Sequence, residues 1–287
     1  MCHNMLKAFV ISDLHGGFPE ALKEAIMEAE PDVVLCCGDV TPFRLRGAFF
    51  EHVYAAEEET TLWEQVGRAT YKGETKKDFA DAHHVLATLD DLPFPARFIP
   101  GNVDRAVWVD EDGESVDRDW AWPGVDRIYP FTKDLLSVKD VSFGVDIVGD
   151  YGIIGYPSSS SPGKVQSDPY RRHRRWLDRA FNTFERMRHE DKTVIFMSHN
   201  GLYDTKTDLI DSDEAVDGVQ GKHFGSKLGR RIVERYQPSV CVHGHIEEGR
   251  GRDRVGKTEV VNVGSGLGGS YAVITLDNGV SVELGYA

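Results

Sequence analysis

The segment Val240–Gly249 ends a run of small apolar residues with two histidines, His243 and His245, that are separated by one glycine. In an extended segment, residues i and i+2 lie on the same side, and a glycine between them lets the backbone bend without a side chain in the way. The two imidazoles are therefore predicted to converge on one small volume. Imidazole is the commonest metal ligand, although two surface histidines at a strand end fit this pattern alone equally well.

Four other apolar segments end in carboxylate, carboxamide or imidazole groups beside a small residue: SDLHGG, CGDV, PGNVD and MSHN. In layered α/β proteins, ligands bind where strand ends gather at one edge. We therefore expect one cluster, made of Asp13, His15, Asp39, Asn102, His199, His243 and His245. This nitrogen and oxygen donor set suits manganese, iron, nickel or zinc. Seven ligands exceed what one ion needs, and with one bridging carboxylate they fit two ions about 3.5 to 4 Å apart.

The elements that must position these residues alternate along the chain. Strands are predicted at Lys7–Ser12, Asp32–Cys37, Ala96–Ile99, Thr193–Asn200 and Ser239–His245, and helices at Phe18–Ala29, Asp168–Glu190 and Gly225–Tyr236. Val145–Tyr156 is predicted to be a hairpin with its turn at GDYG, and the last two strands are predicted to be joined by the turn DNG. This order favours a layered α/β fold with two packed mixed β-sheets.

The length of 287 residues fits one large domain with insertions. We expect a single domain over residues 1–287, with a helical insertion at about 41–92 and a loop insertion at about 105–140. The first insertion is interpreted as a cover over the site, with a partner-binding surface as the alternative. The acidic, tryptophan-containing segment Asp110–Asp126 is predicted to be a loop, and Ser158–Gly163 a flexible link.

Composition narrows the class of protein. Hydrophobic residues make up 40% of the chain and charged residues 28%, and no apolar run approaches the roughly 20 residues that a membrane span needs. The net charge of -14 argues against extended nucleic-acid binding, because phosphates would be repelled. The N-terminus leads directly into a strand and a motif, so we expect no signal peptide and a cytoplasmic protein.

The four cysteines are Cys2, Cys36, Cys37 and Cys241. The last three lie inside apolar strand-like segments, where free cysteine behaves as a small buried residue. Because the sequence contains no CxxC pair, neither a disulfide framework nor a zinc cluster is expected.

The five polar strand endings resemble the ordered motifs of the calcineurin-like metallophosphoesterases, which are D-x-H, G-D, G-N-H-D/E, an isolated H and G-H-x-H. The chain carries them as SDLHG, CGDV, GNVD, SHN and HGHI, in the same order across residues 12–246. The resemblance implies a four-layer α/β sandwich of two mixed β-sheets flanked by helices. It also implies one metal held by Asp13, His15 and His245, a second held by Asn102, His199 and His243, and a bridge at Asp39. Val261–Ser265 resembles the NxGS strand that often follows the last motif.

The resemblance further implies metal-dependent hydrolysis of a phosphoester by a metal-bridging hydroxide, with Mn²⁺ expected and Fe, Ni or Zn as alternatives. A small phosphodiester or nucleotide is the expected substrate, because GDVTPFR and GNVD lack the GDxVDRG and GNHE forms of the serine/threonine protein phosphatases. The alternative is a non-catalytic metal-binding scaffold on the same fold. The sequence gives no indication of the oligomeric state.

One residue departs from the family pattern. Val103 follows Asn102 where many relatives carry a histidine, and valine can neither donate a proton to a leaving group nor bond a phosphate oxygen. His223 is the candidate substitute, because histidine donates protons near neutral pH, although a plain surface histidine fits the pattern as well. Asp104 is expected to orient a neighbouring histidine. Asn102, Asp104 and His223 are thus the candidate catalytic residues.

Two basic segments carry weaker signals. Tyr170–Trp176, YRRHRRW, is interpreted as the solvated face of a helix, with a grip on the phosphates of a nucleotide or nucleic acid as the alternative. Arg250–Arg254, RGRDR, follows the HGHI motif and is expected to be either a substrate contact or a plain turn.

Overall fold

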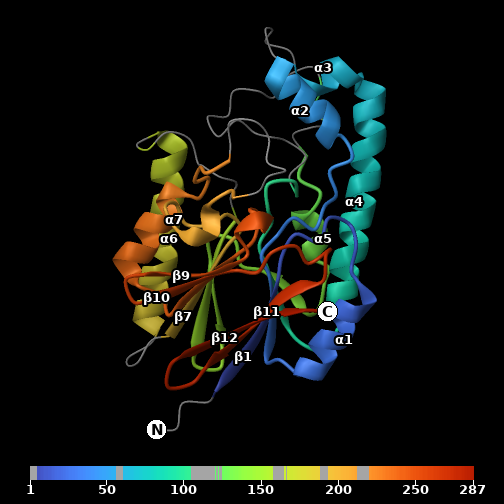
Figure 1. Ribbon diagram of the computed structural model, residues 1–287. Helices are drawn as coiled ribbons and strands as arrows, with labels where there is room; N and C mark the ends of the chain where they lie inside the picture. Colours follow the sequence, from blue (N-terminus) through green and yellow to red (C-terminus); the bar gives the residue numbers. More distant parts are fainter. Residues whose placement is uncertain are drawn as a thin grey trace.

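Two six-stranded β-sheets face each other and are flanked by helices in the computed structural model of the chain (Figure 1). The structure describes residues 5–55, 61–104, 120, 122, 125–157, 165, 167–187, 193–211 and 220–287. The predicted link Ser158–Gly163, most of the predicted loop Asp110–Asp126 and Cys2 lie outside the described residues.

The first sheet has the strand order β12-β11-β1-β2-β3-β4. Its strands β1 to β4 run parallel, β11 pairs antiparallel with β1, and β12 pairs antiparallel with β11 at the edge of the sheet. The bounds are Leu6–Ile11 for β1, Val33–Cys36 for β2, Ala96–Phe98 for β3, Val138–Asp140 for β4, Ser270–Leu276 for β11 and Val280–Tyr286 for β12.

The second sheet has the strand order β5-β6-β7-β8-β10-β9. Its four central strands are parallel, and the edge strands β5 and β9 are antiparallel to their neighbours. The bounds are Val145–Val148 for β5, Tyr151–Tyr156 for β6, Thr193–Ser198 for β7, Val240–His243 for β8, Gly251–Val255 for β9 and Thr258–Asn262 for β10.

Helices cover the outer face of each sheet. Apolar side chains of α1 and α4 pack on the first sheet, and those of α6 and α7 pack on the second. The bounds are Glu20–Ala29 for α1, Arg68–Asp90 for α4, Asp168–Met187 for α6 and Lys227–Tyr236 for α7. Shorter helices are α2 (Arg46–Ala55), α3 (Leu62–Val66), α5 (Tyr129–Thr132) and the 3₁₀ turns η1 (Lys206–Asp208) and η2 (Glu247–Gly249). These layers confirm the predicted sandwich of two mixed sheets flanked by helices.

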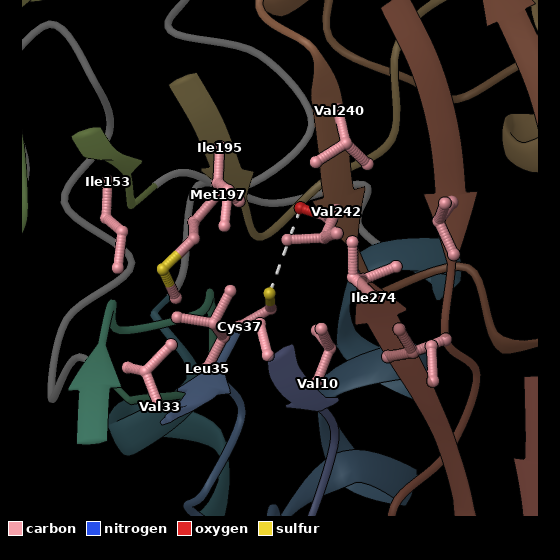
Figure 2. Close-up of a cluster of buried hydrophobic side chains, with 14 of the residues drawn as sticks. Val10, Val33, Leu35, Cys37, Ile153, Ile195, Met197, Val240, Val242 and Ile274 are labelled. Carbon is pink, nitrogen blue, oxygen red and sulfur yellow. Dashed lines mark hydrogen bonds between the residues drawn. The ribbon is translucent and has the colours of Figure 1, made fainter. Parts of the chain in front are cut away.

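Alternation along the strands builds the core between the layers. Successive residues of β1 and β2 are buried on opposite faces, so that Cys37 points between the sheets and Cys36 points toward the helices α1 and α4. Figure 2 shows Leu35 and Cys37 of the first sheet facing Met197 and Val242 of the second, with the Cys37 thiol donating to the carbonyl oxygen of Val242 at 3.8 Å. Cys36, Cys37 and Cys241 are buried free thiols, as predicted.

The two predicted hairpins are confirmed, since β5 pairs antiparallel with β6 and β11 with β12. Residues 129–140 differ from the prediction, because this part of the expected loop contains α5 and β4. The strand β4 has three residues, of which only Val138 is buried, so it carries no hydrophobic period to recognise. The described residues of the range 41–92 contain the helices α2, α3 and α4.

The two basic segments take regular structure. RGRDR is not a plain turn, because Gly251–Arg254 belong to the edge strand β9, whose Arg252 and Arg254 both form ion pairs with Glu259 of β10. A substrate contact by this segment stays a prediction. YRRHRRW lies in α6, where Tyr170 and His173 are buried and the four arginines between Tyr170 and Trp176 are exposed. No helix in the described part of the chain is long and apolar enough to cross a bilayer.

Candidate metal centre

The predicted ligands follow the carboxyl ends of parallel strands, β1 to β3 in one sheet and β7 and β8 in the other. Four of them have left-handed backbone: φ is 55° at Asp13, 43° at His15, 53° at Asp39 and 67° at His245. Such strain in a non-glycine residue persists only when the surroundings hold it. The amide of His15 donates to the carbonyl of Asp39 at 2.9 Å, which ties the two strained turns together.

Two glycines let the strand-end loops approach the carboxylates. A Cβ at Gly244 would lie 2.0 Å from the Oδ2 of Asp13, and a Cβ at Gly101 would lie 2.1 Å from the Oδ1 of Asp39. Any larger residue would displace the carboxylate. The glycine between the two histidines is therefore required by close packing as well as by the bend expected from the sequence.

His199 lies at the centre of one group of donor atoms. Its side chain is fully buried, and its Nδ1–H donates to the carbonyl oxygen of Cys37 at 2.8 Å. The other ring nitrogen, Nε2, lies 2.8 Å from the Oδ1 of Asn102 and 3.4 Å from the Oδ1 of Asp39. Because both oxygens are acceptors, either a proton on Nε2 or a cation between the three atoms must accompany this arrangement.

His245 extends this group. The ligand atoms of Asp39, His199 and His245 lie within 4.8 Å of one another, and the two imidazole centroids are 4.9 Å apart. The backbone amide of His245 also donates to the Oδ2 of Asp13 at 2.9 Å. The motif resemblance placed His245 with Asp13 and His15, whereas the structure groups its side chain with Asp39 and His199.

A second group consists of Asp13, His15 and Glu247, whose ligand atoms also lie within 4.8 Å of one another. The Nδ1–H of His15 donates to the carbonyl oxygen of Thr41 at 3.2 Å, which leaves Nε2 facing the Oε1 of Glu247 at 3.5 Å. Glu247 was not predicted from the sequence. Its position two residues after His245, at the start of η2, is the signal that could have found it.

His243 does not belong to either group. Its ring is buried, and its Nε2 lies 3.0 Å from the hydroxyl of Thr207. The strand β8 ends at His243, and the left-handed backbone of His245 interrupts the alternation of an extended strand, so the two imidazoles do not enter the same group of three. Its Nδ1 lies 3.1 Å from the carbonyl oxygen of Gly244, which can only accept, so Nδ1–H donates there and Nε2 accepts from the Thr207 hydroxyl. A metal ion bound to His243 would take the place of one of these two bonds.

Asp104 binds backbone rather than a histidine, which corrects the role expected for it. The carboxylate is buried and accepts hydrogen bonds from the amides of Asp39 (2.8 Å), Gly101 (2.7 Å) and Thr41 (2.9 Å), and from the Thr41 hydroxyl (2.7 Å). It therefore fixes the loop that carries Asp39. Nothing in the sequence around Asp104 indicated that its carboxylate would bind the amides of Asp39 and Thr41.

His223 is held by a different carboxylate. Its Nδ1 lies 2.8 Å from the Oδ1 of Asp208, which is fully buried and also accepts from the amides of Thr205 and Gly225. The side chain is 31% exposed. His223 is not among the described residues that line the pocket beside Asp13 and Asp39, so its role as a proton donor stays a prediction.

Asn262 joins the two loops behind the site. Its Nδ2 donates to the carbonyl oxygens of Thr207 at 3.0 Å and Ile246 at 2.7 Å, and its Oδ1 accepts from the amide of Gly264 at 2.9 Å. This is the asparagine of the VNVGS segment. These contacts hold Thr207, which bonds His243, and Ile246, which follows His245. The VNVGS segment therefore helps to position both histidines.

The electrostatics of the cluster favour cations. Burial raises the pKa of Asp13 to about 7, against the opposing charge of His199. Burial also acts to raise the pKa of Asp39, but His199, His15 and His245 outweigh it and lower the pKa to about 2. The pKa of His199 rises to about 9, because Asp39 and Asp13 outweigh its burial. The buried carboxylates thus require neighbouring positive charge, which protons or divalent cations supply.

A pocket of about 560 Å³ opens beside these groups. We call its polar side the floor, which consists of Asp13, His15, Asp39, Asn102, His245 and Glu247. A mixed set of nitrogen and oxygen donors suits borderline divalent metals. In His15 and His199 the second ring nitrogen donates to a backbone carbonyl oxygen, as is common in metal-binding histidines. The arrangement can therefore hold cations at the base of a pocket large enough for a small organic ester.

Comparison with known proteins agrees with this chemistry. The sequence profile described as calcineurin-like phosphoesterase matches residues 6–247. The chain belongs to the calcineurin-like phosphoesterase family. It is also 24% identical over 262 residues, which cover 90% of this chain and 87% of the relative, to Uncharacterized protein MJ1162 of Methanocaldococcus jannaschii.

Solved structures share the fold. The crystal structure of TT1561 of Thermus thermophilus has a TM-score of 0.56 and 14% identity, with 99% of each chain covered. Purple acid phosphatase PPD1 from yellow lupin (Lupinus luteus) seeds has a TM-score of 0.53 and 11% identity, with 99% of this chain and 52% of that chain covered. Membership of the calcineurin-like phosphoesterase family supports metal-dependent phosphoester hydrolysis, and it implies divalent metal ions at the donor cluster.

Proposed function

We propose that this phosphoesterase hydrolyses a small phosphodiester or nucleotide with two divalent ions, Mn²⁺ foremost. The main support for the proposal is the environment of Nε2 of His199. This atom lies 2.8 Å from the Oδ1 of Asn102 and 3.4 Å from the Oδ1 of Asp39, an arrangement that a cation between the three atoms would explain. In this proposal Asp39 bridges the ions. The remaining ligands are Asp13, His15, Asn102, His199, His243 and His245, with Glu247 as an added carboxylate beside His15.

Two bound divalent ions lower the pKa of a shared water and neutralise charge on the phosphoryl oxygens. The chain's own residues hold the geometry in which this takes place. The amide of Val103 donates to the Oδ1 of Asp39 at 3.0 Å, and Asp104 binds the loop on its other side. Carbonyl oxygens at Cys37 and Thr41 fix the tautomers of His199 and His15, so that Nε2 of each ring is directed into the cluster.

A diester suits the charge and the lining of the pocket better than a monoester. Arg46 is the only lysine or arginine among the described residues that line the pocket. A diester carries one negative charge, whereas a phosphate monoester approaches two at neutral pH. Val103 also lines the pocket, where it offers a leaving group no proton. Activated or weakly basic leaving groups are therefore favoured.

The test compares bis-(p-nitrophenyl) phosphate with p-nitrophenyl phosphate at equal Mn²⁺ concentration. We expect chelator-sensitive hydrolysis, with kcat/KM at least about tenfold higher for the diester. Equal rates would overturn the diester preference. Protein that contains metal but hydrolyses neither ester would favour the second candidate, a metal-binding scaffold, which Val103 supports because it replaces a proton-donating residue.

A further inference from the structure

One face of α2 lines the same pocket as the floor. Arg46, Phe49 and Phe50 are spaced i, i+3 and i+4, so they lie on the same helix face, and all three line the pocket. The guanidinium of Arg46 lies over the ring of Phe50, 5.5 Å from its centroid. We call these three residues the aromatic wall.

Apolar side chains continue the aromatic wall toward the floor. The ring centroids of Phe43 and Phe49 are 5.5 Å apart, and those of Phe49 and Phe50 are 5.6 Å apart. Val103 and Leu267 line the same pocket, and Leu267 remains 47% exposed. A substrate phosphate on the floor would thus have its organic group among flat rings and aliphatic side chains.

The aromatic wall is anchored to the rest of the protein. Leu45, next to the start of α2, is buried in a cluster with Leu62, Trp63 and Tyr71 of α3 and α4. Arg44 adds two ion pairs to α4, at 2.5 Å to both Asp78 and Asp81. Because these contacts fix the start of α2, the wall residues hold a set position above the floor.

We propose that the aromatic wall selects phosphoesters whose organic group carries a flat aromatic ring, above all a nucleobase. This inference rests on the proposed function and adds its substrate class. A nucleobase stacks on Phe49 or Phe50, and Arg46 supplies positive charge next to the stacked ring. A sugar or polyol ester would instead place hydroxyl groups against side chains that cannot bond them, at a cost in desolvation.

The kinetic test uses three diesters that release the same p-nitrophenolate and differ in the other ester group. These are thymidine 5′-(p-nitrophenyl) phosphate, phenyl p-nitrophenyl phosphate and methyl p-nitrophenyl phosphate. Because the bond that breaks is identical, differences in kcat/KM report recognition of the other group. We expect the thymidine diester to exceed the methyl diester by about tenfold or more, since stacking contributes roughly this factor. The phenyl diester distinguishes a simple aryl ring from a nucleobase.

The variant Phe49→Leu/Phe50→Leu removes the rings and keeps the wall apolar. It should reduce the preference for the thymidine diester by about tenfold and leave kcat/KM for the methyl diester within about twofold. Phe131→Leu is the matched control, because Phe131 is half-buried and stacks on His83, away from the pocket lining. It should leave both values unchanged. Circular dichroism and metal content verify that each variant is folded.

A binding measurement separates this inference from the proposed function. Calorimetry of the Mn²⁺-loaded protein compares thymidine 5′-monophosphate with ribose 5-phosphate, whether or not either is hydrolysed. Tighter binding of the nucleotide by about tenfold, lost in Phe49→Leu/Phe50→Leu, supports the aromatic wall as the recognition surface. Equal affinities for the two ligands, or a nucleotide preference that survives the double substitution, would overturn it even if the protein proves to be a diesterase.

Discussion

The floor and the aromatic wall meet in one pocket but are held in different ways. Four of the six floor residues have left-handed backbone after parallel strands, and two of these four, Asp13 and Asp39, are only 1% and 3% exposed. Wall residues project from one short helix, with Phe49 and Phe50 half-buried and Arg46 exposed. The difference separates chemistry from recognition, because strained and buried positions tolerate little change whereas a helix face accepts many side chains.

The strongest test of this separation is Asp39→Asn. The substitution removes the charge of the proposed bridging carboxylate and one strong oxygen donor, so it should abolish activity and at least halve the bound metal. Metal content is measured by elemental analysis after gel filtration. Retention of both ions with a near wild-type rate would remove Asp39 from the bridging position and weaken the distinction between floor and wall.

Glu247→Gln tests whether the floor includes a ligand beyond the family motifs. Loss of the carboxylate beside His15 should weaken Mn²⁺ binding by about 10- to 100-fold, which is the usual effect of mutating a residue that bonds a metal ligand. Glu248→Gln is the control, because Glu248 is exposed and adjacent in sequence. Calorimetry with Mn²⁺ alone decides the point. Equal affinities for the two variants would exclude Glu247 from the metal centre.

Val103→His sharpens the comparison, because Val103 lies on the floor loop yet lines the apolar side of the pocket. General-acid assistance contributes typically about 10²- to 10⁴-fold, and most for basic leaving groups. We therefore expect a steep dependence of rate on leaving-group pKa in the wild type and a flatter one in the variant. A series of aryl methyl phosphates measures both slopes. An unchanged slope would show that the introduced imidazole does not reach the leaving oxygen.

His223→Ala completes that experiment. If His223 donates the proton in place of residue 103, its loss should slow poor leaving groups far more than good ones. Its bond to Asp208 and its place outside the pocket lining favour equal slowing, or none. Selective slowing of poor leaving groups would restore His223 to the mechanism.

The smallest effect is expected from Asp146→Asn, which should lower stability slightly and leave metal binding and substrate preference unchanged. Asp146 of β5 is 13% exposed and forms ion pairs with Arg97 of β3 and Lys139 of β4, which join the two sheets. Burial acts to raise the pKa of Asp146, but bonds to Lys139 and Arg97 lower it below its usual value. The stabilisation is therefore present above the unfolded pKa of about 4 and lost as pH falls through the folded pKa.

We expect Asp146→Asn to lower the free energy of unfolding by about 1 to 3 kcal/mol at neutral pH, and less at pH 3. Urea denaturation at both pH values measures this difference. A variant that loses metal or substrate preference at unchanged stability would contradict the assignment of Asp146 to the sheet contact.

The sequence was sufficient for the layers and for most of the strand-end cluster, because alternating apolar runs and polar endings are local signals. It could not predict the contacts that depend on loops far apart in sequence. Asp104 binds the amide of Asp39 across 65 positions, and Thr207 meets His243 across 36. The short strands β4 and β9 were missed because each carries a single buried residue.

The aromatic wall shows the same limit. The segment FRLRGAFF was predicted to be helical cover, but its amino-acid types do not reveal which face meets the pocket. Packing of Leu45 against α3 and α4 fixes the start of the helix, and Arg46, Phe49 and Phe50 then line the same pocket as the floor. Recognition residues on an insertion therefore require the tertiary structure, whereas motif ligands do not.

We propose above that the floor holds two divalent ions and that the protein hydrolyses phosphodiesters with them. Anomalous diffraction from Mn²⁺-loaded crystals tests it most directly, with activity measured on the same preparation. We expect two manganese peaks about 3.5 to 4 Å apart, bridged by Asp39, and activity that a chelator removes and Mn²⁺ restores. A single peak in a fully active preparation, or two ions away from Asp39, would contradict it.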